Sequence, residues 1–554
     1  MVFSMKKNVF AVSYIIPLII LVLSLQTNIN IDVYSGDTCF NGTKAYSLLK
    51  HLVRNYKYRV VGTLNDSLAA RWVEDYFKSL DLETYVINFS TVNFKRESVV
   101  GINVYAVKHG LTDEYIVLVA HRDIVPRTIE GANDNGAGVA ILLELARALK
   151  DRDTRYSIIF LVSDSEETGL HGAENFVRSF PEIDKVRYAV SIDMCGWRNS
   201  TGIGLYAFIS WSYRASDANI LLVMFQLEKL GYNVKIEVFT PNGFLEQVVY
   251  RLGLATAGTD SMPFIDAGIP AVGIGDYPLY PYWHTPEDSI DKVSPERLQY
   301  VGEFLERFVL TVDRANIGSY GVNYLFLDSG FIGEPIIYLL ALSLCIPLLV
   351  SLIYDIKAGA RISMYPIVLF SMFLLTFMLT YMAPEAVVLA LWFTRGIRLF
   401  EYLHYIVAAS TILYIILLRI IIAPRIKVDY EIASALRLVS KLVLFIEAVV
   451  VSIFNPVGSL FIVTPTVFTT PLFSRIKKYN RLYNTLLLLL SLIQVMIMIG
   501  SMTVFLGIER IGLGLAWILY CGLESMGIVN FILLLSLAAT SLTSLYYVSI
   551  TRKY

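Results

Sequence analysis

Two patterns of hydrophobic residues divide the chain. Between residues 44 and 313, short apolar runs alternate with helical stripes in which apolar residues recur every three or four positions. The strand-like runs lie at 83–89, 99–107, 116–120, 156–163 and 188–193. The helical stripes lie at 44–56, 66–80, 138–150, 171–179, 216–230 and 295–313, with Asp66 or Ser67 as the expected cap of the second. This alternation predicts an α/β domain with a mostly parallel or mixed sheet and helices on both faces.

The remainder of the chain has the pattern of membrane-spanning helices. Nearly uncharged runs of spanning length lie at 335–354, 362–384, 402–418, 448–474, 482–508 and 525–551. A longer apolar stretch from about residue 438 to 473 is broken by Pro456 and is read as a helical hairpin. Counting the hairpin as two spans places the clusters of Lys and Arg on one side of the membrane. We therefore expect seven spans in this half.

The amino-terminal residues predict an eighth membrane helix. Lys6 and Lys7 precede an apolar core at 9–25, and no small-residue cleavage pattern follows it. This pattern predicts an uncleaved anchor with both chain termini in the cytoplasm. The expected organisation is an anchor at 1–31, an exported domain at 32–320 and a membrane domain at 321–554. The lack of a retention signal and the Ile/Tyr-rich composition favour a plasma membrane.

Composition agrees with this division. Hydrophobic residues make up 55% of the chain and charged residues 17%, which is too apolar for an ordinary soluble protein, so lipid is an expected partner. The formal net charge of -1 gives no general attraction to nucleic acid. Four cysteines are too few for a disulfide scaffold, and whether Cys39 pairs with Cys195 stays open. The exported domain contains four glycosylation sequons, which begin at Asn41, Asn65, Asn88 and Asn199.

Candidate chemistry collects where the predicted strands end. His121 follows the run 116–120, the pair Glu166 and Glu167 follows 156–163, and Asp193 is the last residue of the run 188–193. Adjacent glutamates at a strand end repel each other unless a cation is present; the alternative is a solvated turn. His121 alone also fits a histidine that caps a turn. Five residues form a set of N and O ligands suited to Zn2+, or to Mn2+ or Co2+: His121, Asp134, Glu167, Asp193 and His284.

The order of these motifs resembles a known family. His121-x-Asp123, Gly131-Ala-Asn-Asp134-Asn-Gly, Glu166-Glu167-x-Gly-Leu, Asp193-Met and His284-Thr-Pro look like the M28 family of zinc metallopeptidases, in particular its di-zinc aminopeptidases. The stretch Tyr58-Arg-Val-Val-Gly62-Thr is similar to a motif near the start of that domain. The resemblance covers roughly residues 45–315. The whole plan is also similar to multispan M28 proteins of the endoplasmic reticulum and vacuole, and to the M28-like subunit of the GPI transamidase.

The resemblance implies a role for each residue. It assigns His121 and Asp193 to one zinc ion, Glu167 and His284 to a second, and Asp134 to both. It makes Glu166 the general base for a metal-activated water and Asp123 the partner that orients His121. It also implies a cis peptide bond after Asp134. The family often uses a tyrosine to stabilise the oxyanion, whereas Trp283 directly precedes the last ligand here, with Tyr280 and Tyr282 nearby.

The predicted function is a membrane-anchored, zinc-dependent exopeptidase, an aminopeptidase that hydrolyses peptides on the exported side. Two alternatives remain. One is a catalytically silent M28-like scaffold or assembly subunit, and the other is a transferase similar to the glutaminyl cyclases. The complete ligand set favours the peptidase. Protein partners bound through the membrane domain are a further expectation.

Overall fold

The computed structural model describes residues 12–13, 15–20, 30–206, 215–236, 258–315, 317–327, 330–357 and 361, with scattered positions between 435 and 460. The chain divides into two units, one of residues 28–246 and 256–322, the other of 1–27, 247–255 and 323–554. The predicted spans at 362–384, 402–418, 482–508 and 525–551 lie outside the described residues. Most of the run 448–474 and of the amino-terminal anchor lies outside them too.

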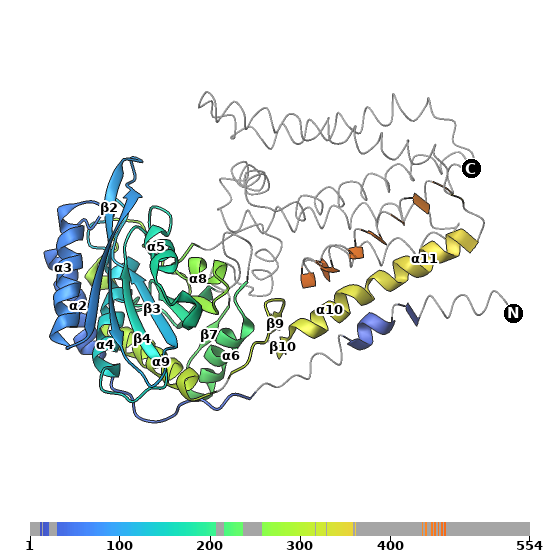
Figure 1. Cartoon of the computed structure of the whole chain (residues 1–554), viewed down its shortest axis with the longest axis horizontal. Coiled ribbons are helices and arrows are strands. Elements are labelled where there is room, and N and C mark those ends of the chain that lie inside the picture. Colours follow the sequence, from blue (N-terminus) through green and yellow to red (C-terminus); the bar gives the residue numbers. More distant parts are fainter. Residues whose placement is uncertain are drawn as a thin grey trace, which may run out of the picture. The chain divides into compact units, whose positions relative to one another are not determined.

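The unit of residues 28–246 and 256–322 is built on an eight-stranded mixed sheet (Figure 1). The strands, in their order across the sheet, are β1 (Glu83–Val92), β2 (Ser98–Lys108), β4 (Ser157–Ser163), β3 (Tyr115–His121), β5 (Val186–Ile192), β8 (Ala271–Tyr277), β6 (Gly202–Tyr206) and β7 (Val234–Lys235). The four central strands β4, β3, β5 and β8 are mutually parallel. Strands β1 and β2 pair antiparallel on one side, and β6 pairs antiparallel with β8 on the other. The sheet is therefore mixed, with a parallel centre.

Helices cover both faces of the sheet, as the sequence predicts (Figure 1). The chain passes from β3 through α4 (Gly138–Leu149) to β4, then back across β3 through α5 (His171–Ser179) to β5. Two right-handed crossovers that run in opposite directions place their helices on opposite faces. Helix α4 packs with α2 (Gly42–Asn55) and α9 (Pro295–Arg314), whereas α5 packs with α8 (Met262–Asp266). Two more helices are α3 (Leu64–Ser79) and α6 (Ala218–Gln226).

The core follows from the apolar runs. Every residue of β3 and of β4 is buried, as expected for parallel strands covered on both sides. On the α5 face, side chains of the central strands pack with Ala173 and Phe176 of α5 and Phe264 and Ile265 of α8. Because the central strands are parallel, their carboxyl ends reach one edge of the sheet. In such sheets, ligands bind at this edge where the strand order reverses, which here is around β3.

Several elements differ from the prediction. Helix α3 is capped by Thr63, whose hydroxyl accepts the N–H of Asp66; neither Asp66 nor Ser67 is the cap, and Asp66 is buried. The helix expected at 216–230 ends at Gln226 and continues as a 3-10 turn. Strands β6 and β8 were not predicted. Cys39 is exposed, Cys195 is buried, and both are free thiols.

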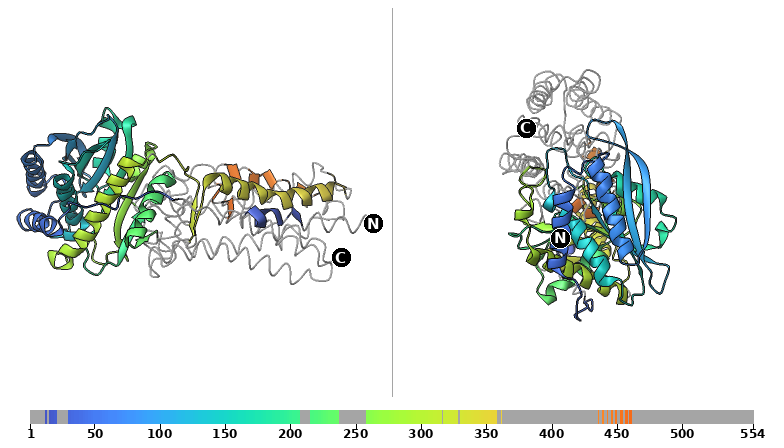
Figure 2. Two further views of the ribbon diagram at one scale, coloured as in Figure 1. Left: turned by 90° about the horizontal axis from the view of Figure 1, so that it is seen from below. Right: turned by 90° about the vertical axis from the view of Figure 1, so that its left-hand side faces the viewer.

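The other unit contains one helical run with the length and composition of a membrane span among the described residues. Helices α10 (Glu334–Ser343) and α11 (Cys345–Lys357) together form the run Glu334–Lys357, whose most apolar 18-residue window has a mean hydropathy of 2.7 (Figure 2). It includes the expected span at 335–354. A short hairpin of β9 (Leu325–Leu327) and β10 (Gly330–Ile332) precedes it. The number and orientation of the other spans stay predictions.

Candidate active site

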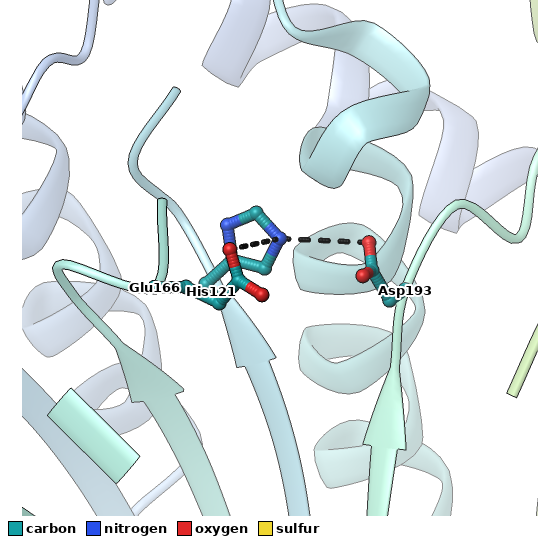
Figure 3. Close-up of side chains that lie close together, drawn as sticks. All are labelled: His121, Glu166 and Asp193. Carbon is teal, nitrogen blue, oxygen red and sulfur yellow. Dashed lines mark ion pairs between the residues drawn. The ribbon is translucent and has the colours of Figure 1, made fainter. Parts of the chain in front are cut away.

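The parallel centre of the sheet brings the predicted residues together. His121 is the last residue of β3, Glu166 lies in the turn after β4, and Asp193 directly follows β5. The imidazole of His121 lies between the carboxylates of Glu166 and Asp193 (Figure 3). Its Nε2 is 3.5 Å from Asp193 Oδ1 and 3.9 Å from Glu166 Oε2. Two side chains from neighbouring strand ends therefore converge on one nitrogen of His121.

Asp134 connects the two histidines. Its Oδ1 lies 3.6 Å from His121 Nε2, and its Oδ2 lies 3.4 Å from His284 Nε2. The same nitrogen of His284 is 2.8 Å from Glu167 Oε2. A carboxylate whose two oxygens face different imidazoles has the arrangement required of a ligand shared between two metal ions. The peptide bond between Asp134 and Asn135 is cis, as the resemblance implies.

Asp123 positions the glutamate pair as well as His121. Its two carboxylate oxygens accept the backbone N–H groups of Glu166, at 3.1 Å, and Glu167, at 3.2 Å. Its Oδ1 also lies 3.6 Å from His121 Nδ1, and its backbone oxygen is 3.2 Å from that nitrogen. One buried carboxylate therefore fixes the turn after β4 against the end of β3. The sequence predicted its relation to His121 but not its two bonds to the glutamate turn.

The two glutamates differ in environment. The Glu167 side chain is 4% exposed, and its Oε1 is buried without a hydrogen-bond partner among the described residues. The Glu166 side chain is 10% exposed, and neither of its oxygens is buried in this way. Glu167 is therefore the more enclosed of the two side chains, and Glu166 is the more exposed.

Burial and crowding shift the protonation of the cluster. Burial, together with the charges of neighbouring carboxylates, raises the pKa of Asp134 and of Glu166 well above their usual ranges. Burial, with the charges of Asp123, Asp193 and Asp288, raises the pKa of Glu167 to about 8. Burial opposes protonation of His121, but the charge of Glu166 and the nearby carboxylates of Asp123 and Asp193 outweigh it and raise the His121 pKa. In the absence of a metal ion, protons bound to these carboxyl groups reduce the repulsion between their negative charges.

The described residues fit a metal ion. Three buried polar atoms at this site have no hydrogen-bond partner among the described residues: His121 Nε2, Glu167 Oε1 and Asp193 Oδ1. Two groups of possible ligand atoms, each within 4.8 Å of one another, are His121 with Glu166 and Asp193, and His121 with Asp134 and Glu167. An unsatisfied buried polar atom costs about 1–3 kcal/mol, which a bound cation would relieve. Imidazole and carboxylate donors suit Zn2+ and similar divalent ions.

Comparison with known families agrees with this geometry. Residues 103–309 match the family model described as peptidase family M28. This stretch is an M28 peptidase domain. It contains every residue of the candidate site, from His121 to His284. It also contains every strand of the eight-stranded sheet except β1 and the first residues of β2.

The M28 domain is similar to proteins of differing activity. It is 31% identical over 209 residues to aminopeptidase YwaD of Bacillus subtilis, an alignment that covers 36% of this chain and 40% of that protein. A vacuolar membrane protease of Candida albicans is 30% identical over 186 residues, which cover 34% of this chain and 20% of that protein. A glutaminyl-peptide cyclotransferase of Drosophila melanogaster is 23% identical over 269 residues, which cover 44% of this chain and 75% of that protein. The chain thus spans less than half of the first two.

A zinc aminopeptidase from Bacillus subtilis superposes with a TM-score of 0.44 at 17% sequence identity, covering 51% of this chain and 97% of that one.

Asp288 supports the loop that carries Asp134 in the M28 domain, a role that was not predicted from the sequence. Its Oδ1 accepts the N–H of Asn133 at 2.8 Å, and its Oδ2 accepts the N–H of Asp134 at 3.1 Å. The hydroxyl of Tyr280 donates to the same Oδ1 at 2.9 Å. Tyr280 is fully buried and already bonded, so it does not act as an oxyanion donor. The nearness of Asp288 to His284 in the sequence was the one available signal.

We expect Asp288→Asn to weaken metal binding about 10- to 100-fold, because it changes the support of the shared ligand rather than a ligand itself. The asparagine NH2 would face an N–H or O–H donor and leave it unsatisfied, at a cost of about 1–3 kcal/mol. Metal titration and thermal unfolding measure the two effects. Tyr280→Phe, which removes one donor, is the control and should cost less. Wild-type metal affinity in Asp288→Asn would contradict this role.

A buried arginine holds the two loops of the M28 site together. The guanidinium of Arg59 donates to the backbone oxygens of Arg122 at 2.9 Å, Glu130 at 2.8 Å and Gly131 at 3.1 Å. The backbone oxygen of Arg122 lies one residue after His121. Those of Glu130 and Gly131 lie four and three residues before Asp134. Gly131 has a φ of 55°, and a Cβ there would lie 2.8 Å from the backbone oxygen of Asp134. Arg59, within the Tyr58–Thr63 motif, thus holds together the two loops that carry the predicted ligands.

Left-handed backbone conformations also cluster at the M28 site. Ser165, which precedes the glutamate pair, has a φ of 60°, Met194, which follows Asp193, has 51°, and His284 itself has 57°. Such conformations cost on the order of 1–3 kcal/mol per residue and persist where the surroundings enforce them, often at functional sites. Ser165 and Met194 adjoin Glu166 and Asp193, and His284 is a predicted ligand itself, which supports a functional role for this edge of the sheet.

Proposed function

We propose that this chain is a membrane-anchored, zinc-dependent aminopeptidase. The observation that supports it most is Asp134, whose two oxygens face His121 and His284 at 3.6 Å and 3.4 Å. A shared carboxylate between two histidines suits a pair of zinc ions, one held with Asp193 and the other with Glu167. The metals would polarise the scissile carbonyl and lower the pKa of a bound water.

The protein groups supply proton transfer and position in this proposal. Glu166 accepts the proton of the attacking water and transfers it to the leaving amine. Asp123 holds the backbone of both glutamates, so that one faces the metals and its neighbour faces the water. With two zinc ions bound, the five carboxylates of the cluster would outnumber the four positive charges of the metals by one, and this excess would attract the α-ammonium group of a peptide. An exopeptidase that removes amino-terminal residues follows from that preference.

Metal content and hydrolysis together test the proposal. The purified full-length chain should bind two zinc ions and cleave leucine p-nitroanilide, but not its N-acetylated form, which lacks the α-ammonium group. Metal binding with cyclisation of amino-terminal glutamine, without hydrolysis, would favour the transferase alternative that the cyclotransferase relative suggests. No bound metal after zinc is supplied would overturn the enzyme proposal and favour the scaffold.

We also propose that the M28 domain lies on the exported side, with eight spans, cytoplasmic termini and a plasma-membrane location. The resemblance to the vacuolar membrane protease and the apolar run Glu334–Lys357 support membrane association. The exposed thiol of Cys39 allows a test. A membrane-impermeant maleimide should label intact cells that carry the chain, and Cys39→Ser should remove the label. Labelling only after the cells are broken would place the M28 domain on the cytoplasmic side and contradict the proposed orientation.

Chelation should reverse how stability depends on pH. Burial raises the pKa of Glu167 from its usual 4.5 to about 8 in the metal-free protein, so the folded state holds a proton that the unfolded state releases. The free energy of unfolding of the chelated protein should therefore fall as pH rises from about 4.5 to about 8. With zinc present it should rise over this range, because the metal replaces these protons. Thermal unfolding at several pH values checks the sign, and a chelated protein that gains stability up to pH 8 would contradict it.

A further inference from the structure

The outer edge of strand β1 is long and lacks the usual protection of a sheet edge. Strand β1 (Glu83–Val92) lies at one end of the eight-stranded sheet, and among the described residues only β2 pairs with it (Figure 1). Its ten residues pair with β2 without a shift in register. Native proteins usually protect such an edge with a very short strand, a lysine, a proline or a bulge. Strand β1 has none of these features.

The hydrogen bonds of Ile102, on β2, show which backbone groups of β1 point outward. The N–H of Ile102 donates to Asp164 Oδ2 at 2.7 Å, and its backbone oxygen accepts from Arg122, so both groups point away from β1. Asn88 is the partner of Ile102 in the ladder. Because paired residues in an antiparallel ladder point toward each other or away from each other together, the backbone groups of Asn88 also point outward. The same holds for every second residue of β1, and these N–H and C=O groups have no hydrogen-bond partner among the described residues: Thr84, Val86, Asn88, Ser90 and Val92.

The two ends of β1 carry opposite charges that are not used within the domain. Asp81 precedes the strand, and Lys95 and Arg96 follow it in the turn to β2. All three are exposed, and none forms an ion pair with another residue in the described part of the chain. The two glutamates of the hairpin, Glu83 and Glu97, are instead hydrogen-bonded to side chains nearby, at 2.7 Å and 2.9 Å. An unpaired negative charge at one end therefore matches unpaired positive charges at the other.

We propose that β1 pairs antiparallel with β1 of a second copy of this chain, across a two-fold axis at Asn88. Outward-pointing residues must face outward-pointing residues, and one such register overlaps all of them: position 84 faces 92, 86 faces 90, and 88 faces 88. Continued beyond the strand, this register places Asp81 of each copy opposite Lys95 of the other. Two ion pairs therefore form at symmetry-related places.

The charges at the strand ends favour a second copy in this orientation. A parallel pairing in register would place Asp81 beside Asp81 and Lys95 beside Lys95, which is unfavourable. The antiparallel arrangement is self-complementary, as a two-fold interface requires. It also gives cross-strand neighbours to Val86 and Val92, which are 43% and 36% exposed. The pairing does not depend on the chemistry of the M28 site, but it requires that Asn88, which begins a sequon, carries no glycan.

Single cysteines test the register in the full-length chain. Paired Cα atoms that exchange hydrogen bonds across antiparallel strands lie about 5.5 Å apart, which suits a disulfide, so Asn88→Cys should link the two copies under mild oxidation. Ser90→Cys is the matched control: it is exposed and also has outward-pointing backbone groups, but its two copies would be roughly 13 Å apart along the strands, too far for a disulfide. Both substitutions remove the sequon at Asn88. The background variant is Cys39→Ser, which removes an exposed thiol.

A charge exchange and a proline test the energetics, with the dimerisation constant of the full-length chain measured by sedimentation in detergent. Asp81→Lys and Lys95→Asp should each weaken the dimer by about 2- to 30-fold, because each removes two exposed ion pairs. The double variant should recover the wild-type constant to within about threefold, since the pairs form again with their signs exchanged. Val86→Pro removes an outward N–H and no bond to β2, so it should weaken the dimer by at least about 5-fold.

The cysteine pair decides the proposal even where another variant fails to fold. A disulfide-linked dimer of Asn88→Cys, with little of it in Ser90→Cys, supports pairing about the axis at Asn88. Equal linkage at both positions would show chance collision or another register and overturn the proposal. A wild-type chain that stays monomeric as its concentration is raised, or a glycan on Asn88 of the natural protein, would overturn it as well. A double charge variant as weak as the single variants would show that Asp81 and Lys95 do not meet.

Discussion

Replacing Glu166 with glutamine is expected to lower kcat by about 10²- to 10⁴-fold and to leave the bound metal in place. Glutamine has nearly the shape of glutamate, and the backbone N–H of this residue would still donate to Asp123 at 3.1 Å. What is lost is the group that accepts a proton from water. Because Glu166 is one of several crowded carboxylates with raised pKa values, removing its charge should also not destabilise the fold.

The adjacent residue is the matched control. Glu167 lies 2.8 Å from His284 Nε2 and has a buried oxygen without a hydrogen-bond partner in the described part of the chain. We therefore expect Glu167→Gln to lose metal as well as activity. The comparison decides a point that distances leave open, because Glu166 Oε2 is also within 3.9 Å of His121 Nε2. If Glu166→Gln loses metal, Glu166 is a ligand, and the roles of the two glutamates must be exchanged.

The residues at the centre of the site could be predicted because each lies at or just after the end of an apolar run in the sequence. A buried parallel strand appears as a continuous apolar run, so the polar residue that ends the run marks the edge of the sheet. This argument found His121, Glu166 and Asp193, which the structure brings together. Helix α5 was predicted with its observed limits, His171–Ser179, for a similar reason, since its amphipathic pattern is complete within the segment.

Strand β8 was not predicted, because its glycines are required by contacts with residues distant in the chain and not by a local turn. Gly273 and Gly275 resemble turn residues in the sequence. In the structure a Cβ on Gly273 would lie 2.7 Å from Thr259 Oγ1, and one on Gly275 would lie 2.6 Å from the hydroxyl of Tyr206, on β6. These glycines allow neighbouring groups to approach the strand closely. Nothing local in the sequence indicates that Tyr206 fills this space.

The supporting residues were missed because their partners are distant in the chain. The sequence predicts Asp66 or Ser67 as a helix cap, yet Asp66 is buried and pairs with Arg122, 56 positions away, at 3.0 Å. Arg122 also pairs with Asp164 at 2.8 Å, which ties the ends of β3 and β4 together. Asp288 likewise acts on a loop 154 positions before it. Motifs and strand ends identify candidate ligands, but folding alone shows which charged residues hold them in place.

Replacing Asp134 with asparagine is expected to reduce the bound metal to one ion or fewer and to lower kcat on the order of 10³-fold. The variant keeps the size of the side chain and the N–H that donates to Asp288 at 3.1 Å, so the loop should remain in place. One of the two oxygens that face His121 and His284 becomes an NH2 group, which cannot bind a metal ion. Loss of metal polarisation is worth several kcal/mol, and each 1.36 kcal/mol is a tenfold change in rate.

Metal analysis and thermal unfolding measure the loss of metal from Asp134→Asn without relying on activity. Added zinc should raise the unfolding temperature of wild type far more than that of Asp134→Asn, since a ligand stabilises the folded state by RT ln(1 + [L]/Kd) and the variant binds zinc less tightly. Asp260→Asn is the control: this buried aspartate near His121 also has one oxygen, Oδ1, without a hydrogen-bond partner among the described residues, but its Oδ2 accepts the hydroxyl of Ser163 and it is not a predicted ligand, so the substitution should retain both ions. Two ions bound to Asp134→Asn with wild-type affinity would show that the carboxylate is not shared. The site would then consist of independent metal positions, and the aminopeptidase chemistry proposed for it would lose its structural basis.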